Sequence, residues 1–168
     1  MVQKAERFLR DRIYDSVHGT ELDEGWTPLR CAVHEKNEKM VKYLLAQDNI
    51  DVESPLTASF GQIDFSRGMT ILHSAMAWST PNIVAMLLNA GAKTNVTSGA
   101  LGNPFNHAIK PGNIKTVRFW MKRFPEYKLA LASASNIFTP MCALCYYGSG
   151  SADEIAMMAD FIARSPEQ

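Results

Sequence analysis

Apolar residues recur at three- and four-residue spacing in short stretches of this chain. The stretches 41–45 (VKYLL) and 84–88 (VAMLL) each carry a branched residue followed three and four positions later by a pair of leucines. This spacing places the apolar side chains on one face of an α-helix. Gly91 follows the second stretch, and glycine is the residue that most readily ends a helix in the left-handed conformation. The pattern predicts two amphipathic helices.

A second, shorter helix is predicted ahead of each of these stripes. Thr27 and Thr70 stand where a side-chain hydroxyl can cap a helix, and Pro28 occupies the first helical position, where its missing N–H costs nothing. Each unit therefore reads as a helix, a turn and a second, antiparallel helix. One such pair cannot bury its apolar face alone, so several pairs are expected to stack.

The phrase that opens the unit returns along the chain. GWTPLRCAV begins at Gly25 and GMTILHSAM at Gly68, and weaker copies occupy 103–108 with 117–121, and 139–144 with 157–162. The copies at Thr70 and Asn103 are 33 positions apart. A Thr-Pro-Leu-His-x-Ala phrase at this period resembles the ankyrin repeat. Only the second copy keeps the histidine, His73, while Arg, Asn and Cys replace it in the first, third and fourth copies.

The resemblance implies an all-α fold, an ankyrin-repeat solenoid of stacked helix-turn-helix pairs with short hairpins or loops between repeats. Residues 1–22 are expected to form a capping helix, because apolar residues gather on one of its faces. The repeat domain is expected to span 23–164, with an inserted loop at 56–65. The four repeats are placed at about 23–55, 66–98, 99–134 and 135–164.

Composition narrows the choice of partner and compartment. Of the 168 residues, 46% are hydrophobic, enough for a substantial core, and the 17 basic residues balance the 17 acidic ones. The balance gives no overall field that would attract nucleic acid or an anionic membrane. Three cysteines do not suggest a disulfide framework, and the N-terminal segment is interrupted by charges. The expected location is the cytoplasm or the nucleus.

Candidate chemistry favours structural interpretations. Cys142 and Cys145 have the C-x-x-C spacing of zinc and redox sites, but two further ligands are missing, so both are interpreted as inert core residues. His73 lies at the family's structural histidine and is expected to brace neighbouring repeats. His34 and His107 have no nucleophile motif nearby. The basic run 115–123 alternates with an apolar stripe and is interpreted as the solvated face of a helix. No catalytic residue, cofactor or metal is expected.

The resemblance also indicates where a partner would bind. Ankyrin proteins usually meet partners at the hairpin tips and at the exposed ends of the first helices. Large aromatic residues occur at several of these positions, and such residues often dominate binding energy. The predicted partner-binding residues are Asp23, Glu24, Trp26, His34, Glu35, Arg67, Met69, Trp78, Lys110, Phe138, Tyr146 and Tyr147.

The predicted function is that of a non-enzymatic module that binds another protein through this concave groove. One alternative is a substrate-recruiting ankyrin segment of a larger effector or enzyme, with the catalytic part outside this chain. A second is weak self-association through the terminal repeat. The sequence names neither the partner nor the pathway, since repeat scaffolds host unrelated surfaces.

Overall fold

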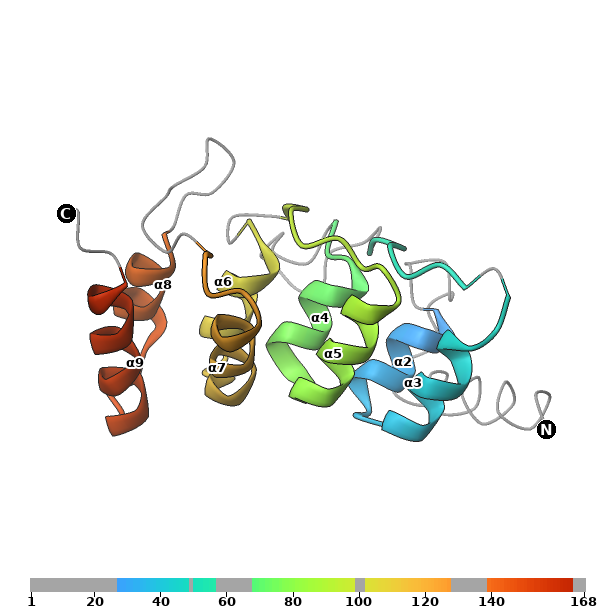
Figure 1. Cartoon of the computed structure of the whole chain (residues 1–168), viewed down its shortest axis with the longest axis horizontal. Coiled ribbons are helices and arrows are strands. Elements are labelled where there is room, and N and C mark those ends of the chain that lie inside the picture. The colour runs from blue at the N-terminus through green and yellow to red at the C-terminus, as the bar shows by residue number, and fades with distance from the viewer. Residues whose placement is uncertain (1–26, 49, 57–67, 99–101, 128–138, 165–168) are drawn as a thin grey trace, which may run out of the picture.

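The computed structural model describes residues 27–48, 50–56, 68–98, 102–127 and 139–164 of the chain (Figure 1). The described residues form helices joined by turns and loops, and their only β-type pairing is an isolated bridge between Ser98 and Gly102. The all-helical prediction is therefore confirmed. The helices are α2 Pro28–His34, α3 Glu38–Leu45, α4 Ile71–Trp78, α5 Pro81–Asn89, α6 Pro104–Ile109, α7 Ile114–Arg123, α8 Pro140–Tyr147 and α9 Ala152–Ala163.

The first helix of each pair begins where the repeated phrase predicts. Thr27 is the N-cap of α2, and its hydroxyl accepts a hydrogen bond from the Arg30 N–H at 3.2 Å. Asn103 and Thr139 cap α6 and α8 in the same way, at 2.9 and 3.1 Å. A proline follows the cap in α2, α6 and α8. The cap satisfies a backbone donor that the first turn of a helix leaves unpaired, which fixes the start of each unit.

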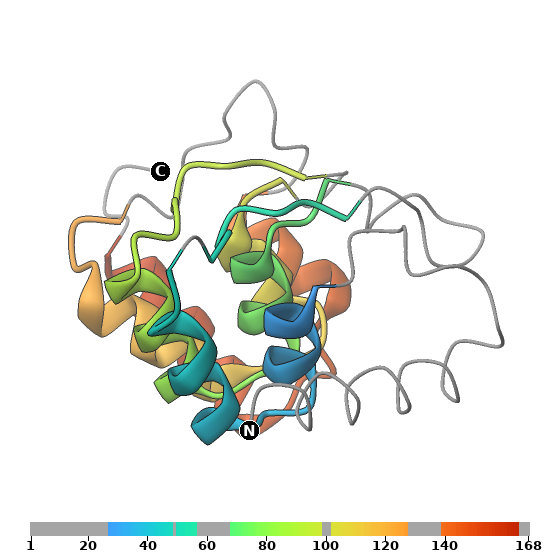
Figure 2. The same cartoon turned by 90° about the vertical axis from the view of Figure 1, so that its right-hand side faces the viewer.

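The pairs stack side by side in chain order, so the molecule is a two-layer solenoid. Viewed along the stack, α2, α4, α6 and α8 form one layer and α3, α5, α7 and α9 form the other (Figure 2). Loops between pairs lie along one edge of the stack, and the turns inside each pair lie along the opposite edge (Figure 1). Apolar side chains between the layers and between successive pairs form one continuous core.

The predicted stripes are the residues that enter this core. Val41, Val84 and Leu87 are fully buried, and Gly91 ends α5 with a φ of 92°, the left-handed conformation predicted for it. The basic run in α7 also has the predicted arrangement of buried apolar residues and exposed basic residues. Its Val117 is fully buried and its Trp120 is 1% exposed, whereas its lysines and arginines face solvent.

In the first two pairs, the side chain at the fourth position of the phrase ties the pair to the one that follows. Arg30 is 1% exposed and donates hydrogen bonds to Ser74 Oγ at 2.8 Å and to the Met69 carbonyl at 2.9 Å. His73 donates from Nε2 to the Gly102 carbonyl at 3.1 Å, while its Nδ1 accepts from the Thr70 N–H at 3.2 Å. The predicted brace between repeats is confirmed.

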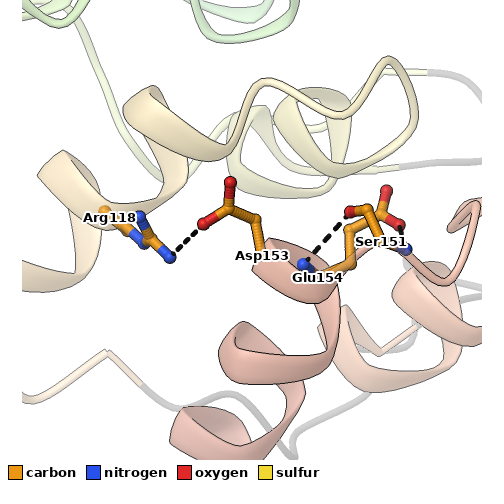
Figure 3. Close-up of polar contacts among 4 residues, drawn as sticks. All are labelled: Arg118, Ser151, Asp153 and Glu154. Carbon is orange, nitrogen blue, oxygen red and sulfur yellow. Dashed lines mark hydrogen bonds and ion pairs between the residues drawn. The ribbon is translucent and has the colours of Figure 1, made fainter.

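The fourth pair packs on the third through α8 against α6, and an ion pair also joins the second helices of the two pairs. Arg118 of α7 forms a 2.7 Å ion pair with Asp153 of α9 (Figure 3). At the start of α9, Ser151 accepts a hydrogen bond from the Glu154 N–H, and the Glu154 carboxylate accepts from the Ser151 N–H (Figure 3). Hydrogen bonds, first from the Ser149 hydroxyl, lower the pKa of Glu154. Residues 148–151 lie between α8 and α9.

Several predicted elements fall outside the described residues. These are the capping helix at 1–22, almost all of the inserted loop at 56–65, and the segment that leads into α8. Five of the predicted partner-binding residues also lie there, namely Asp23, Glu24, Trp26, Arg67 and Phe138.

Candidate functional site at the turn edge

Six of the seven described partner-binding candidates lie at the C-terminal ends of the first helices. We call this part of the molecule the turn edge, because each first helix there meets the turn into its second helix. His34 and Trp78 are the last residues of α2 and α4, and Tyr147 is the last residue of α8. The other three are Glu35, Lys110 and Tyr146. The helix ends of all four pairs thus contribute to one edge.

The first cluster on this edge surrounds Trp78. The indole is 46% exposed, and its ring centroid lies 6.5 Å from that of His34 in the preceding pair. Together they border a cleft of about 460 Å³. Its lining residues are His34, Lys36, Ala77, Trp78, Ser79, Pro111 and Asn113. Three successive pairs therefore contribute to a single concave surface.

A second cluster continues the edge toward the fourth pair. The Lys110 ammonium lies 5.6 Å from the centre of the Tyr147 ring, within the range of a cation–π interaction. Tyr146 packs edge-on against Tyr147, with ring centroids 4.8 Å apart, and is itself 70% exposed. Burial raises the pKa of Tyr147. Because Lys110 directly precedes Pro111, the two clusters adjoin.

Hydrogen bonds hold the turns of the edge in place. The Ser79 hydroxyl donates to the Val33 carbonyl at 2.9 Å, linking the end of α4 to the end of α2. The Asn113 amide donates to the carbonyls of Met76 and Ser79, each at 3.0 Å, linking the next turn to α4. A surface that is already ordered loses less entropy when a partner binds. Trp78 is therefore presented from a rigid setting.

Met69 does not belong to this surface, and its prediction as a binding residue is wrong. Met69 is 2% exposed and directly precedes Thr70, the buried N-cap of α4. Its carbonyl accepts hydrogen bonds from the Leu56 N–H and from the Arg30 side chain. Met69 precedes the N-cap of α4, whereas Trp78 is the last residue of that helix, and the eight helical residues at 1.5 Å per residue span about 12 Å. Met69 and Trp78 therefore lie near opposite edges of the stack.

Lys36 is a residue of the edge that the sequence analysis missed. It adopts a left-handed backbone conformation, with φ 55°, which is unusual for a side chain other than glycine. In the matching turn of the third pair this position is held by Gly112, with φ 70°. Alignment of the repeats could have identified Lys36, because it is a lysine at a turn position that favours glycine. Strained residues of this kind concentrate at functional sites.

The buried histidines serve the core rather than the edge. His73 is fully buried and His107 is 4% exposed, and their rings meet edge to face at 4.9 Å. Burial lowers the pKa of His73 to about 3 and that of His107 to about 4. Protonation of His73 would also place a hydrogen on Nδ1, where the Thr70 N–H already donates. Both imidazoles are therefore neutral near pH 7.

The cysteines differ from the prediction. Cys31 is buried, and burial raises the pKa of its thiol to about 12, so this thiol is inert. Cys142 and Cys145 are exposed, which corrects their interpretation as core residues. They lie on the side of α8 that no described helix covers. Within the described ranges, no group of three or more His, Cys, Asp or Glu is placed to hold a metal ion.

Comparison with known proteins identifies the family. A family model described as ankyrin repeats in three copies matches residues 5–98, more than half of the chain. The chain belongs to the ankyrin repeat family, whose members are generally protein–protein interaction modules. The structure repeats the same helix pair over 104–123 and 140–163, beyond the matched region. The match begins inside the segment that the sequence analysis assigned to a capping helix.

One curated relative is delta-latroinsectotoxin-Lt1a from Latrodectus tredecimguttatus. It is 29% identical over 91 residues, which are 54% of this chain and 7% of the toxin. The chain thus spans a small part of that relative's length. Among the described helices, none has the length and apolar character needed to cross a membrane.

Proposed function

We propose that this chain is a non-enzymatic module that binds a partner protein at the turn edge. The observation that carries the proposal is the placement of Trp78, half exposed beside His34 over a cleft that three repeats line. The repeat architecture itself does not need a large aromatic residue there, since the matching position in the first pair, counted from the N-cap, is Glu35. Half-exposed tryptophans next to a concave surface are typical anchors of protein interfaces.

The chemistry of the edge favours a mixed apolar and acidic partner segment. Trp78 and Pro111 supply apolar surface and Lys36 supplies positive charge in the lining of the cleft, while Lys110 supplies positive charge in the adjoining cluster at Tyr147. An apolar side chain could occupy the centre and carboxylates could approach the lysines, which matches the apolar centre and polar rim of stable interfaces. The candidates that lie outside the described residues, such as Trp26 and Phe138, stay predictions.

The proposal is tested by affinity capture with matched variants. Trp78→Ala and Tyr146→Ala alter the turn edge, whereas Tyr43→Ala removes a 36% exposed aromatic from α3, in the other layer of the solenoid. We expect one protein to be captured by the wild type and by Tyr43→Ala, and lost with both edge variants. Capture that is unaffected by either edge change, or abolished by Tyr43→Ala, would contradict the assignment of the edge.

A second candidate function is substrate recruitment within a larger effector or enzyme. The observation that favours it is that the toxin relative is far longer than the region it shares with this chain. In that case the turn edge would hold a substrate protein, and catalysis would lie outside residues 1–168. Sequencing of the complete transcript separates the two candidates, because a reading frame limited to these residues rules out the second.

A further inference from the structure

The ends of the first helices place ring-bearing side chains in a regular row along the turn edge. Counted from the N-cap, the eighth position is Trp78 in the second pair, Pro111 in the third and Tyr147 in the fourth. Successive first helices contact one another and lie side by side (Figure 2). The two aromatic rings and the proline ring between them therefore follow one another at one step per pair. We call Trp78, Pro111 and Tyr147 the ring row.

The ring row can be reached from solvent in each of its three pairs. Trp78 is 46% exposed, Pro111 is exposed and Tyr147 is half buried. Trp78 and Pro111 line the same cleft of about 460 Å³. Tyr147 continues the row beyond Pro111, since the ammonium of the neighbouring Lys110 lies 5.6 Å from the centre of the Tyr147 ring. A partner segment that follows the row would therefore contact a ring in three successive pairs.

The step of the ring row matches the pitch of one extended backbone conformation. Packed helices lie about 8–10 Å apart, so the rings recur at about that distance. A polyproline II helix has three residues per turn and rises 3.1 Å per residue, which gives a turn of about 9.3 Å. Every third residue of such a segment would meet one ring. A β-strand repeats each face after about 6.7 Å and would lose this register within one step.

The backbone of a polyproline II segment also offers what the indole of Trp78 can bind. Within the described ranges, no protein acceptor is placed for the Trp78 indole N–H. The carbonyls of a polyproline II helix have no internal hydrogen bonds and can accept from it, whereas an α-helix pairs its own carbonyls. Proline-rich segments hold this conformation before they bind, and aromatic-lined grooves recognise them. The ring row has this character.

Charges near the ring row indicate what should flank the prolines. Lys36 lines the cleft at the Trp78 end of the row, and Lys110 lies beside Tyr147 at the other end. Glu35, the only acidic candidate on the edge, has its carboxylate 3.8 Å from Nδ1 of His34. The members of the ring row carry no charge near pH 7. An uncharged centre with carboxylates on both sides is therefore the complementary occupant.

We propose that the turn edge binds a proline-rich segment of a partner protein in the polyproline II conformation, with acidic residues on both sides of the prolines. The inference rests on the function proposed for the turn edge and names the kind of segment bound there. Prolines at three-residue spacing pack on the ring row, and the Trp78 indole donates to a backbone carbonyl of the segment. Lys36 and Lys110 attract the flanking carboxylates.

Synthetic peptides test the proposal on the purified chain. The probe has nine prolines flanked on each side by two glutamates, and its prolines extend over about 28 Å, more than two steps of the row. Three matched peptides replace the prolines by alternating glycine and serine, replace the glutamates by lysines, or carry the same glutamates on an alanine-rich helix. Binding is followed through the indole N–H signals of the three tryptophans in nitrogen-15 spectra, with the Trp78 signal assigned from its loss in Trp78→Phe.

We expect the glutamate-flanked proline peptide to shift the Trp78 signal saturably and to leave that of the buried Trp120 unchanged. The glycine–serine peptide should bind at least about tenfold more weakly, because its backbone must be ordered on binding. The lysine-flanked peptide should bind at least about fivefold more weakly at low salt, because it is repelled where the first is attracted.

Variants of the chain separate the contributions of the ring and of the charges. Trp78→Phe keeps an aromatic ring but loses the N–H, and should weaken binding of the proline peptide about two- to tenfold, the range for one hydrogen bond. Lys36→Gln should weaken binding of the glutamate-flanked peptide and leave that of an uncharged proline peptide unchanged. Tyr43→Ala, in the other layer, should bind like the wild type. Tryptophan fluorescence and amide signals follow the titrations of Trp78→Phe.

Four outcomes would overturn the proposal. The first is no saturable binding of the glutamate-flanked proline peptide up to about 1 mM, the limit of weak association. The second is binding that shifts the Trp78 signal no more than that of Trp120. The third is equal affinity for the glycine–serine peptide, and the fourth is tighter binding of the helical peptide. Unfolding midpoints of the variants confirm that they remain folded.

This inference and the proposed function fail in different ways. If no proline peptide binds while Trp78→Ala still abolishes capture of the partner protein, the turn edge remains a binding surface and the kind of segment is wrong. If the peptides do not bind and capture is also independent of Trp78, both are wrong. Peptide binding at Trp78 as described supports both.

Discussion

Trp120 and Trp78 are the same side chain in two settings of one molecule. Trp120 lies in α7, is 1% exposed and packs against Phe105, Phe124 and Tyr127 with ring centroids between 4.7 and 6.3 Å apart. Trp78 ends α4, is 46% exposed and has a ring contact only on its His34 side among the described aromatic pairs. The Trp120 indole is part of the core, and the Trp78 indole lies outside it.

The contrast extends to the regions around the two residues. Inside the stack, positions of the repeated phrase and of the second-helix stripe are filled by buried apolar residues or by polar residues with fixed partners, such as Arg30 and His73. At the turn edge, backbone geometry is held equally firmly, but the side chains that project from it vary from repeat to repeat. A repeat scaffold can therefore keep its fold while its edge is adapted to a partner.

The largest expected effect lies in the core. Trp120→Ala should lower the free energy of unfolding by about 3–5 kcal/mol, because it removes the largest fully buried side chain and leaves a cavity. Trp120→Phe should cost clearly less, since the Trp120 indole N–H is buried without a hydrogen-bond partner and its removal deletes an unsatisfied donor. Urea unfolding of both variants measures this. Equal losses for Ala and Phe would contradict the packing described here.

A smaller effect is expected from the buried histidine pair. The folded-state pKa values of His73 and His107, about 3 and about 4, lie below their ordinary value, so between pH 7 and pH 5 the unfolded chain gains protons that the folded chain does not. As the pH is lowered below the unfolded pKa, the free energy of unfolding should fall by about 1.4 kcal/mol per pH unit for each histidine. Between pH 7 and pH 5 the two histidines together should lower it by about 2–4 kcal/mol.

Urea titrations at pH 7, 6 and 5 measure this dependence. His107→Gln should reduce the slope by about half, since one of the two titrating groups is gone. Trp78→Ala, which removes no titrating group, is the control and should leave the slope unchanged. A free energy of unfolding that is the same at pH 7 and pH 5 would show that the pair is not buried in its neutral form.

Substitution of Lys36 is expected to stabilise the fold, in contrast to the losses of stability predicted above. Lys36→Gly should raise the free energy of unfolding by about 0.5–1 kcal/mol, because relief of a left-handed residue outweighs the added flexibility of the unfolded chain. The same change should weaken partner binding, since it removes a charge from the margin of the cleft. Thermal unfolding and a binding titration of one variant measure both. If the variant is less stable than the wild type, contacts of the Lys36 side chain stabilise the fold by more than its left-handed backbone conformation costs.

The sequence predicted the interior of the stack better than its surface. The caps, stripes and the His73 brace follow from local rules on capping, periodicity and hydrogen bonding, which act within a few residues. These features could therefore be predicted from the sequence for residues 27–123. The exposure of Cys142 and Cys145 was not predictable in this way, because it depends on whether another helix pair lies over α8.

The candidate surface was predicted in part for a related reason. Positions at first-helix ends can be read from the register, and the structure brings His34, Trp78, Lys110 and Tyr147 onto one edge. Met69 was misassigned because register does not show how the preceding loop folds back, as it does when Leu56 pairs with Met69. Lys36 was missed because its backbone conformation, and not its chemistry, sets it apart.

The most direct test of the account measures stability and affinity on Trp78→Ala, using the protein captured by the wild type as ligand. Because Trp78 is half exposed and outside the core, we expect a change in the free energy of unfolding of about 0.5 kcal/mol or less. Affinity for the partner should fall by about 2 kcal/mol or more, the loss typical of an interface hot spot. A loss of several kcal/mol in stability with affinity unchanged would place Trp78 in the core and contradict a binding surface at the turn edge.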